Sequence, residues 1–272
     1  MTAAAPATPA RPVRPARRAW RGFGLLVRTE ARVWLRDFAA PFFGILFPTL
    51  ILVGVGYAIP GMRDPITDAP VTSVWYGLTP IATYLPTVMA MAVGTASLTV
   101  MPVTIATYRE KGVLRRLSTT PMRPQGIVLS HLLINVATTV VGVVLALVVA
   151  QLAFGIAVPQ HLGVVLLAFV LGLCAMFSLG MLVAAVAPRA SVANAVAMSL
   201  YFPMLLLAGL WTPGPIMPEL LRQIGQFTPL GAASQAMTTG WFESGFPLLQ
   251  CVVMVVWTAV LLPLAVRLFR WT

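Results

Sequence analysis

The sequence predicts an all-α membrane protein with six transmembrane helices, preceded by an amphipathic interfacial helix. Three observations support this fold class. Of the 272 residues, 59% are hydrophobic and only 9% are charged, whereas soluble domains carry charge on about a quarter of their residues. The mean hydropathy is +0.90. Several charge-free runs are longer than the ~20 residues that a helix needs to cross the hydrocarbon core. These properties exclude a soluble enzyme, a nucleic-acid-binding domain and a disulfide-stapled secreted protein.

The N-terminal region is predicted to be a tail followed by a surface helix. Residues 1–16 are mostly Ala, Pro and Arg, which is typical of a disordered cytoplasmic tail and also of a mitochondrial transit peptide. Residues 17–37 have helical periodicity, with aromatic residues on one arc and arginines on another. Such a helix places its aromatic side at the acyl boundary and its arginines on lipid headgroups. The predicted interface residues are Trp20, Phe23, Arg28, Arg32, Trp34 and Arg36. The alternative is a basic tail without a fixed helix.

Six spans account for the apolar runs that follow. The charge-free run 124–188 would be ~98 Å long as one helix, about three bilayers deep, so it must turn back. Pro159 and its polar neighbours mark the turn, and Pro80 and Pro86 predict a lead-in segment before the second span. The predicted spans of the domain 38–266 are 38–59, 85–107, 127–150, 163–187, 191–211 and 247–266, with a proline-rich, re-entrant outer region at 212–246 and a C-terminus at 267–272.

The distribution of basic residues predicts the orientation. Most of the 18 Lys and Arg residues are clustered before the first span, between the second and third spans, between the fourth and fifth, and after the sixth. Six crossings place all these clusters on one side of the membrane, with only Arg63 and Arg222 on the other. Cytoplasmic loops are enriched in Lys and Arg. We therefore expect both termini to be cytoplasmic, and we expect no nucleic-acid partner.

The loop 108–125 has more features than a simple connection requires. Its sequence, YREKGVLRRLSTTPMRPQ, contains a helix-compatible stretch, a pair of leucines and a Thr-Pro stop. Leucines that fill a groove and charges that pair with a partner are typical of a docking element. The residues predicted to couple to a partner are Glu110, Gly112, Leu114, Arg115, Arg116 and Leu117. The alternative is a solvated charged loop.

Several kinds of chemistry are missing from the sequence. The only lysine, Lys111, is followed by glycine and is not part of a phosphate-binding GxxxxGK[ST] loop. None of the seven acidic residues lies in a predicted span, which disfavours a gradient-driven carrier because such carriers commonly need an intramembrane acid. The two histidines, His131 and His161, are predicted on opposite sides of the membrane, which disfavours a zinc site. We expect no catalysis, and no cofactor or metal in this chain.

The order of these features resembles the type-2 ATP-binding-cassette (ABC) exporter permeases, particularly the daunorubicin-resistance-like drug exporters of actinobacteria. The helix before the first span is similar to the interface helix of that family. The segment 109–122 is similar to its E-x-G-x-L-x-R-L-x-x-T-P motif, and the segment 218–230 resembles its late outer pattern, with Thr228 where asparagine is common. The matching motif residues are Glu110, Gly112, Leu114, Arg116, Leu117, Thr120 and Pro121.

The resemblance implies a half-transporter with the transmembrane fold of that family. Two permease subunits, identical or paralogous, would pair in the bacterial cytoplasmic membrane, and each would bind a separate ABC ATP-binding subunit that holds ATP and Mg²⁺. The loop 108–125 would dock on that subunit, and the region 212–246 would cap the exit. The expected function is export of a hydrophobic or amphipathic small molecule such as a drug, antibiotic or lipid, in multidrug efflux or antibiotic resistance. The alternatives are a gradient-driven carrier and a non-transport assembly or anchoring subunit.

Overall fold

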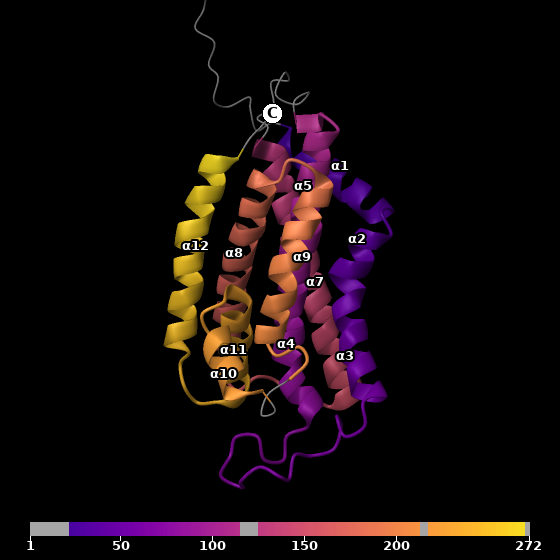
Figure 1. Ribbon diagram of the computed structural model, residues 1–272. Coiled ribbons are helices and arrows are strands. Elements are labelled where there is room, and N and C mark those ends of the chain that lie inside the picture. Colours follow the sequence, from indigo (N-terminus) through magenta and orange to yellow (C-terminus); the bar gives the residue numbers. More distant parts are fainter. Residues whose placement is uncertain (1–21, 115–124, 213–216, 270–272) are drawn as a thin grey trace, which may run out of the picture.

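The computed structural model describes residues 22–114, 125–212 and 217–269, which form a bundle of long helices (Figure 1). Across these ranges the chain contains helices, turns and loops but no strand. Six helices are long and apolar enough to cross a membrane: Ala39–Ala58, Pro80–Glu110, Gln125–Phe154, Leu162–Val186, Ala190–Leu207 and Leu248–Leu268. The predicted six-span, all-α membrane fold is therefore confirmed.

The first span follows the helix α1 (Phe23–Arg36) and consists of three consecutive segments. These are α2 (Ala39–Pro41), the π-helical segment η1 (Phe42–Leu46) and α3 (Phe47–Ala58). The π segment ends two residues before Pro48, which has no N–H to donate to the carbonyl four residues earlier. An extra residue in the preceding turn accommodates this missing bond.

The second span is the most buried of the six and has the same construction. It consists of α4 (Pro80–Gly94), the π-helical segment η2 (Thr95–Val100) and α5 (Met101–Glu110). Again the π segment ends two residues before a proline, Pro102. The predicted lead-in segment before residue 85 was wrong, because the helix already begins at Pro80. Proline is well tolerated in the first turn, where its missing N–H would be unpaired in any case.

The remaining spans are single helices, α7 (Gln125–Phe154), α8 (Leu162–Val186), α9 (Ala190–Leu207) and α12 (Leu248–Leu268). The chain turns back between α7 and α8, as the sequence predicted. However, α9 ends four residues before the predicted boundary at 211. Gly209 follows the cap of α9 with φ +88°, a left-handed conformation that glycine adopts readily and that ends a helix.

The two ends of the bundle differ in structure (Figure 1). Helix α1 and the end of α12 lie at one end, which we call the α1 end. At the opposite, far end lie the helices α10 (Glu219–Gly225) and α11 (Pro229–Phe242), which belong to the predicted outer region. Most residues of α11 are buried, and the helix packs against α4, α8 and α12. The Thr228 hydroxyl caps it by accepting a hydrogen bond from the Gly231 N–H at 3.1 Å.

Small residues allow the helices to approach closely. Gly180 of α8 lies directly against the backbone of Ser97 in η2, and a Cβ atom added at Gly180 would overlap the Ser97 carbonyl oxygen. Gly142 of α7 lies in the same way against Gly44 of η1. Contacts of this kind between small residues are characteristic of membrane helices, where packing replaces the hydrophobic drive that water provides. Both π segments are therefore held in the bundle by glycine contacts.

Candidate functional site

The predicted coupling loop begins at the α1 end of the bundle, where α5 ends at Glu110. Gly112 follows in a left-handed turn with φ +67°. Leu114 is only 1% exposed and belongs to the core of this chain. This corrects the expectation that Leu114 is presented to a partner, since its side chain is covered by its own bundle. Arg115, Arg116 and Leu117, the other residues predicted to dock, lie outside the described residues.

Two charged residues at the end of α5 hold the turn between α8 and α9. The Arg109 guanidinium donates to the carbonyl oxygens of Ala184 and Ala187 at 2.8 and 2.6 Å, and it lies over the ring of Phe269. The Glu110 carboxylate accepts a hydrogen bond from the N–H of Ala190 at 3.2 Å. A cation thus meets the carboxyl end of one helix, and an anion meets the amino end of the next. Both contacts give a partner to backbone groups that have none within their own helix, and each places a charge at the helix end whose dipole has the opposite sign.

This contact differs from the one that the sequence predicted for Glu110. The sequence predicted that the carboxylate pairs with a partner chain, whereas the structure shows that it binds the first residue of α9. The loop is therefore joined at its base to α9.

A partly buried polar cluster lies at the same end and was not predicted. Glu30 of α1 accepts a hydrogen bond from the Tyr108 hydroxyl at 2.8 Å, and its Oε2 atom lies 3.2 Å from Nε2 of His131 in α7. The His131 side chain is 5% exposed and the Glu30 side chain 13%. The contact with His131 lowers the pKa of Glu30 although burial acts in the opposite direction, and the Tyr108 bond adds to the lowering. The cluster ties α1 to both helices that flank the loop.

A helical projection of the sequence would have identified Glu30. It is the only acidic residue between 17 and 36, and it lies three residues after Val27 and four before Trp34, on the apolar side of the helix. An acid in that position needs a buried partner. The partners themselves, at positions 108 and 131, come from distant parts of the sequence, and their proximity depends on the fold.

We expect Glu30→Gln to unfold at a lower temperature than the wild type at pH 7. The loss of a charged hydrogen-bond acceptor typically costs about 1.5–3 kcal/mol. Because folding lowers the pKa of this carboxyl from 4.5, its stabilisation is present above that pH and is lost as the pH falls through the folded-state value. The difference between the melting temperatures of the two proteins in detergent should therefore narrow as the pH falls below 4.5. Asp68→Asn, at an exposed position, is the control and should melt like the wild type at pH 7 and below pH 4.5.

The apolar side of α1 packs on the bundle. Trp34 is 8% exposed and lies against Gly44, while Phe23 lies near Gly126 at the start of α7. This corrects the expectation that Trp34 lies at the acyl boundary, because protein covers it. Arg28, Arg32 and Arg36 are exposed on the other side of the helix, and Trp20 lies outside the described residues.

A groove of about 520 Å³ runs along α9. The first span forms its other wall, and η2 and α5 contribute the residues between them. It extends from Asp37 at the α1 end to Trp211 beyond the end of α9. Both π segments contribute to the lining, as π segments at functional sites often do. The groove therefore follows the first span from its start to Ile51, and α9 from Met198 to Leu205.

The lining of the groove is largely aromatic and aliphatic, with a few hydroxyl groups. Phe43 and Phe202 are 43% and 54% exposed along it. Deeper, the hydroxyls of Thr95 and Tyr201 lie 2.6 Å apart, and Tyr201 also donates to the carbonyl of Met91 at 3.2 Å. A volume within the ~300–1,000 Å³ range of small-molecule sites, with few polar groups, suits a hydrophobic or amphipathic molecule. The sequence alone did not identify these residues, because they come from three separate stretches of the chain, 37–51, 91–104 and 198–211.

Comparison with known families agrees with this architecture. Residues 21–242 match the family model described as ABC-2 type transporter. A comparison with curated proteins finds no match. The matched region contains α1, the first five spans, the loop between the second and third spans, and both short helices at the far end. Members of the family are transmembrane components of ABC transporters and work with an ATP-binding subunit. With most of its length matched and six membrane-length helices, this multi-pass membrane protein belongs to the ABC-2 type transporter family.

Proposed function

We propose that the chain is the permease of an ATP-driven exporter in a bacterial cytoplasmic membrane. It moves a hydrophobic or amphipathic small molecule outward, and both termini face the cytoplasm. Two such subunits pair, and each binds an ABC ATP-binding subunit that holds ATP and Mg²⁺ and carries out hydrolysis. The observation that carries this proposal is that the base of the loop 108–125 is bound to α9, which is also a wall of the groove.

This arrangement suggests how ATP hydrolysis drives transport. The loop docks on the ATP-binding subunit and moves when that subunit closes on ATP. Arg109 and Glu110 transmit the movement to the turn between α8 and α9. Helix α9 then shifts relative to the first span and changes the width of the groove. The Glu30 cluster holds α1 to both ends of the loop, so the interfacial helix moves with it.

The experiment that tests the proposal is reconstitution in lipid vesicles with a candidate ATP-binding subunit. We expect the permease to stimulate ATP hydrolysis and to move an amphipathic fluorescent dye only when ATP is present, regardless of whether a protonophore is added. Dye movement that needs a proton gradient and not ATP would indicate a carrier. The absence of both stimulation and movement, for a permease that binds the ATPase, would indicate an assembly or anchoring subunit.

We expect Phe202→Ala to raise the KM for the transported dye about 2- to 10-fold. An aromatic contact of this kind contributes roughly 0.5–1.5 kcal/mol, which corresponds to that range of affinity. Leu206→Ala is the control, because Leu206 is also exposed on α9 but does not line the groove. Equal KM values for both variants and the wild type would show that the groove does not bind the dye.

A further inference from the structure

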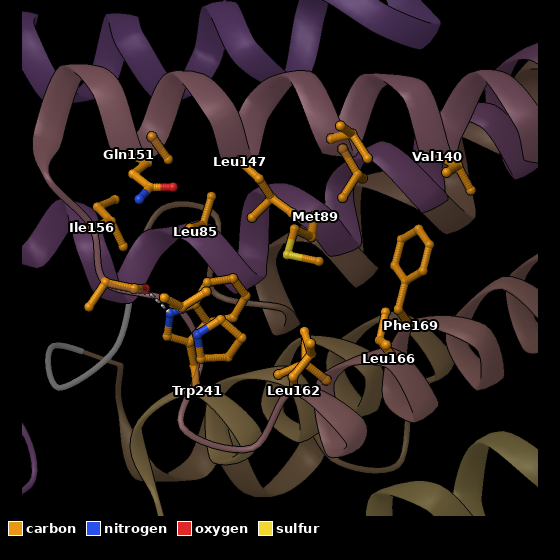
Figure 2. A pocket seen from close by; sticks show the side chains of 17 residues that line it. Leu85, Met89, Val140, Leu147, Gln151, Ile156, Leu162, Leu166, Phe169 and Trp241 are labelled. Atoms are coloured by element: carbon orange, nitrogen blue, oxygen red, sulfur yellow. Dashed lines mark hydrogen bonds between the residues drawn. The ribbon is translucent and has the colours of Figure 1, made fainter.

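A second cavity lies in the far half of the bundle, between α7 and α8 (Figure 2). Its volume is about 230 Å³, and every lining residue except Gln151 is apolar or aromatic. Leu85 and Met89 of α4 and Trp241 of α11 form its floor and are 1%, 4% and 5% exposed. The cavity is separate from the groove described above and shares no lining residue with it.

The cavity is elongated along the helix axis. On α7 the lining residues recur every three or four positions from Val140 to Gln151, so they form one stripe about 16 Å long. Figure 2 shows Val140 and Phe169 at one end and Gln151 and Ile156 at the other. Since α7 crosses the membrane, the long direction of the cavity is also the direction in which acyl chains run.

The rim of the cavity is continuous with the lipid-facing surface. Val144 of α7 and Leu166 of α8 line it and are 52% and 54% exposed. In a span, exposed apolar side chains of this kind lie against hydrocarbon. The cavity therefore opens to the bilayer interior, from which a ligand can enter it.

We propose that this cavity binds one acyl chain of a membrane phospholipid. Its volume is below the ~300 Å³ at which sites for drug-sized ligands begin, which favours a single chain over a compact polycyclic molecule. The Gln151 amide has no side-chain hydrogen bond to any described residue, and it lies at the far end of the cavity, where it can donate to the ester carbonyl of the lipid. The Trp241 indole N–H is already bonded to the Ala157 carbonyl at 3.0 Å, so the ring presents only its apolar surface. This site does not depend on the proposed export.

The test uses the full chain in phosphatidylcholine vesicles that contain a phospholipid with a photoreactive diazirine in its acyl chain. After illumination, mass spectrometry of peptides locates the adducts. We expect adducts on Met89 or Trp241, which lipid on the outer surface of the bundle does not reach. Val144→Trp fills the mouth of the cavity and should lower labelling of these buried residues about tenfold, the change expected from displacing roughly two buried methylene groups.

The matched control is Val141→Trp. Val141 is 53% exposed, against 52% for Val144, but does not line the cavity, so labelling of Met89 and Trp241 should stay at the wild-type level. Both positions are exposed, and equal yields and melting temperatures will show that both variants are folded. The proposal is overturned if the buried residues are not labelled, or if the two variants label alike. It is also overturned if adding a transported drug removes the labelling, because that would indicate a substrate site. A cross-link between Val144 and a second copy of the chain would overturn it too, because the rim would then face protein and not lipid.

Discussion

Replacing Gly180 with alanine is expected to lower the yield of folded protein several-fold. The added methyl group would overlap the carbonyl oxygen of Ser97. That oxygen is backbone, in the second span, so no rotation of a side chain relieves the overlap. Either α8 or η2 must move, although both lie in the core. Overpacking of this kind costs about 1–3 kcal/mol and sometimes more, a large share of the ~5–15 kcal/mol that stabilises a protein.

The measurement is the amount of monodisperse protein in detergent, together with its melting temperature. Gly54→Ala is the matched control, because Gly54 lies in α3 and a Cβ atom there meets nothing within 4 Å. That substitution should be neutral or slightly stabilising, since alanine has a better helix propensity than glycine. A Gly180→Ala protein as abundant and as stable as Gly54→Ala would contradict the close contact between α8 and η2.

Replacing Glu110 with lysine is expected to reduce transport and drug-stimulated ATP hydrolysis about tenfold. Lysine cannot accept the hydrogen bond from the Ala190 N–H, and its charge repels the positive end of α9. Losing the side-chain acceptor at a helix N-terminus typically costs about 0.5–2 kcal/mol, and the unfavourable charge adds about 0.3–1 kcal/mol, which together correspond to roughly tenfold. Glu110→Gln keeps an oxygen that accepts the bond and should lose less activity.

The decisive measurement is whether the ATP-binding subunit still co-purifies with the Glu110→Lys permease. If Glu110 acts within the chain, the subunit should be retained at the wild-type ratio, and basal ATP hydrolysis should continue without transport. Loss of the subunit would show that Glu110 contacts the partner directly, as the sequence predicted. Lys111→Glu is the control for a change of charge in the same loop, since Lys111 is exposed beside Glu110.

The spans could be predicted because they depend on length and charge alone. A helix must cover a fixed thickness of hydrocarbon, and the charge-free runs of this chain leave few other ways to fold. The error at Pro80 shows where such reasoning stops. A proline can either break a helix or occupy its first turn. Which of the two occurs at Pro80 depends on the hydrogen bonds that the segment before it makes with the start of the helix. In the fold, the Ile81 N–H bonds to the Met62 carbonyl at 3.0 Å, which fixes the start of the helix.

Contacts between distant segments could not be predicted from local patterns. The spacing of Leu114 from Leu117 in the sequence is the same whether Leu114 faces a partner or the core of its own chain. The structure places it in the core. The carboxylate of Glu110 is drawn to the start of α9 because the turn after α8 leaves an unpaired N–H there. Glu30 could be recognised as an acid on an apolar face, but its partner His131 lies about a hundred residues away. These pairings depend on how the helices are arranged.

The two π segments affect how this permease tolerates changes in chain length. Each segment holds one residue more than an α-helical turn of the same height. This extra residue rotates the rest of the helix by about 100° about its axis. Deleting one residue between Phe42 and Leu46 would restore an ordinary helix and turn Phe47 and Ile51 away from the groove that they line. A chimaera with a related permease thus keeps its groove only if it preserves the residue count between Ala39 and Phe47. In these two spans the number of residues is constrained as strictly as their identity.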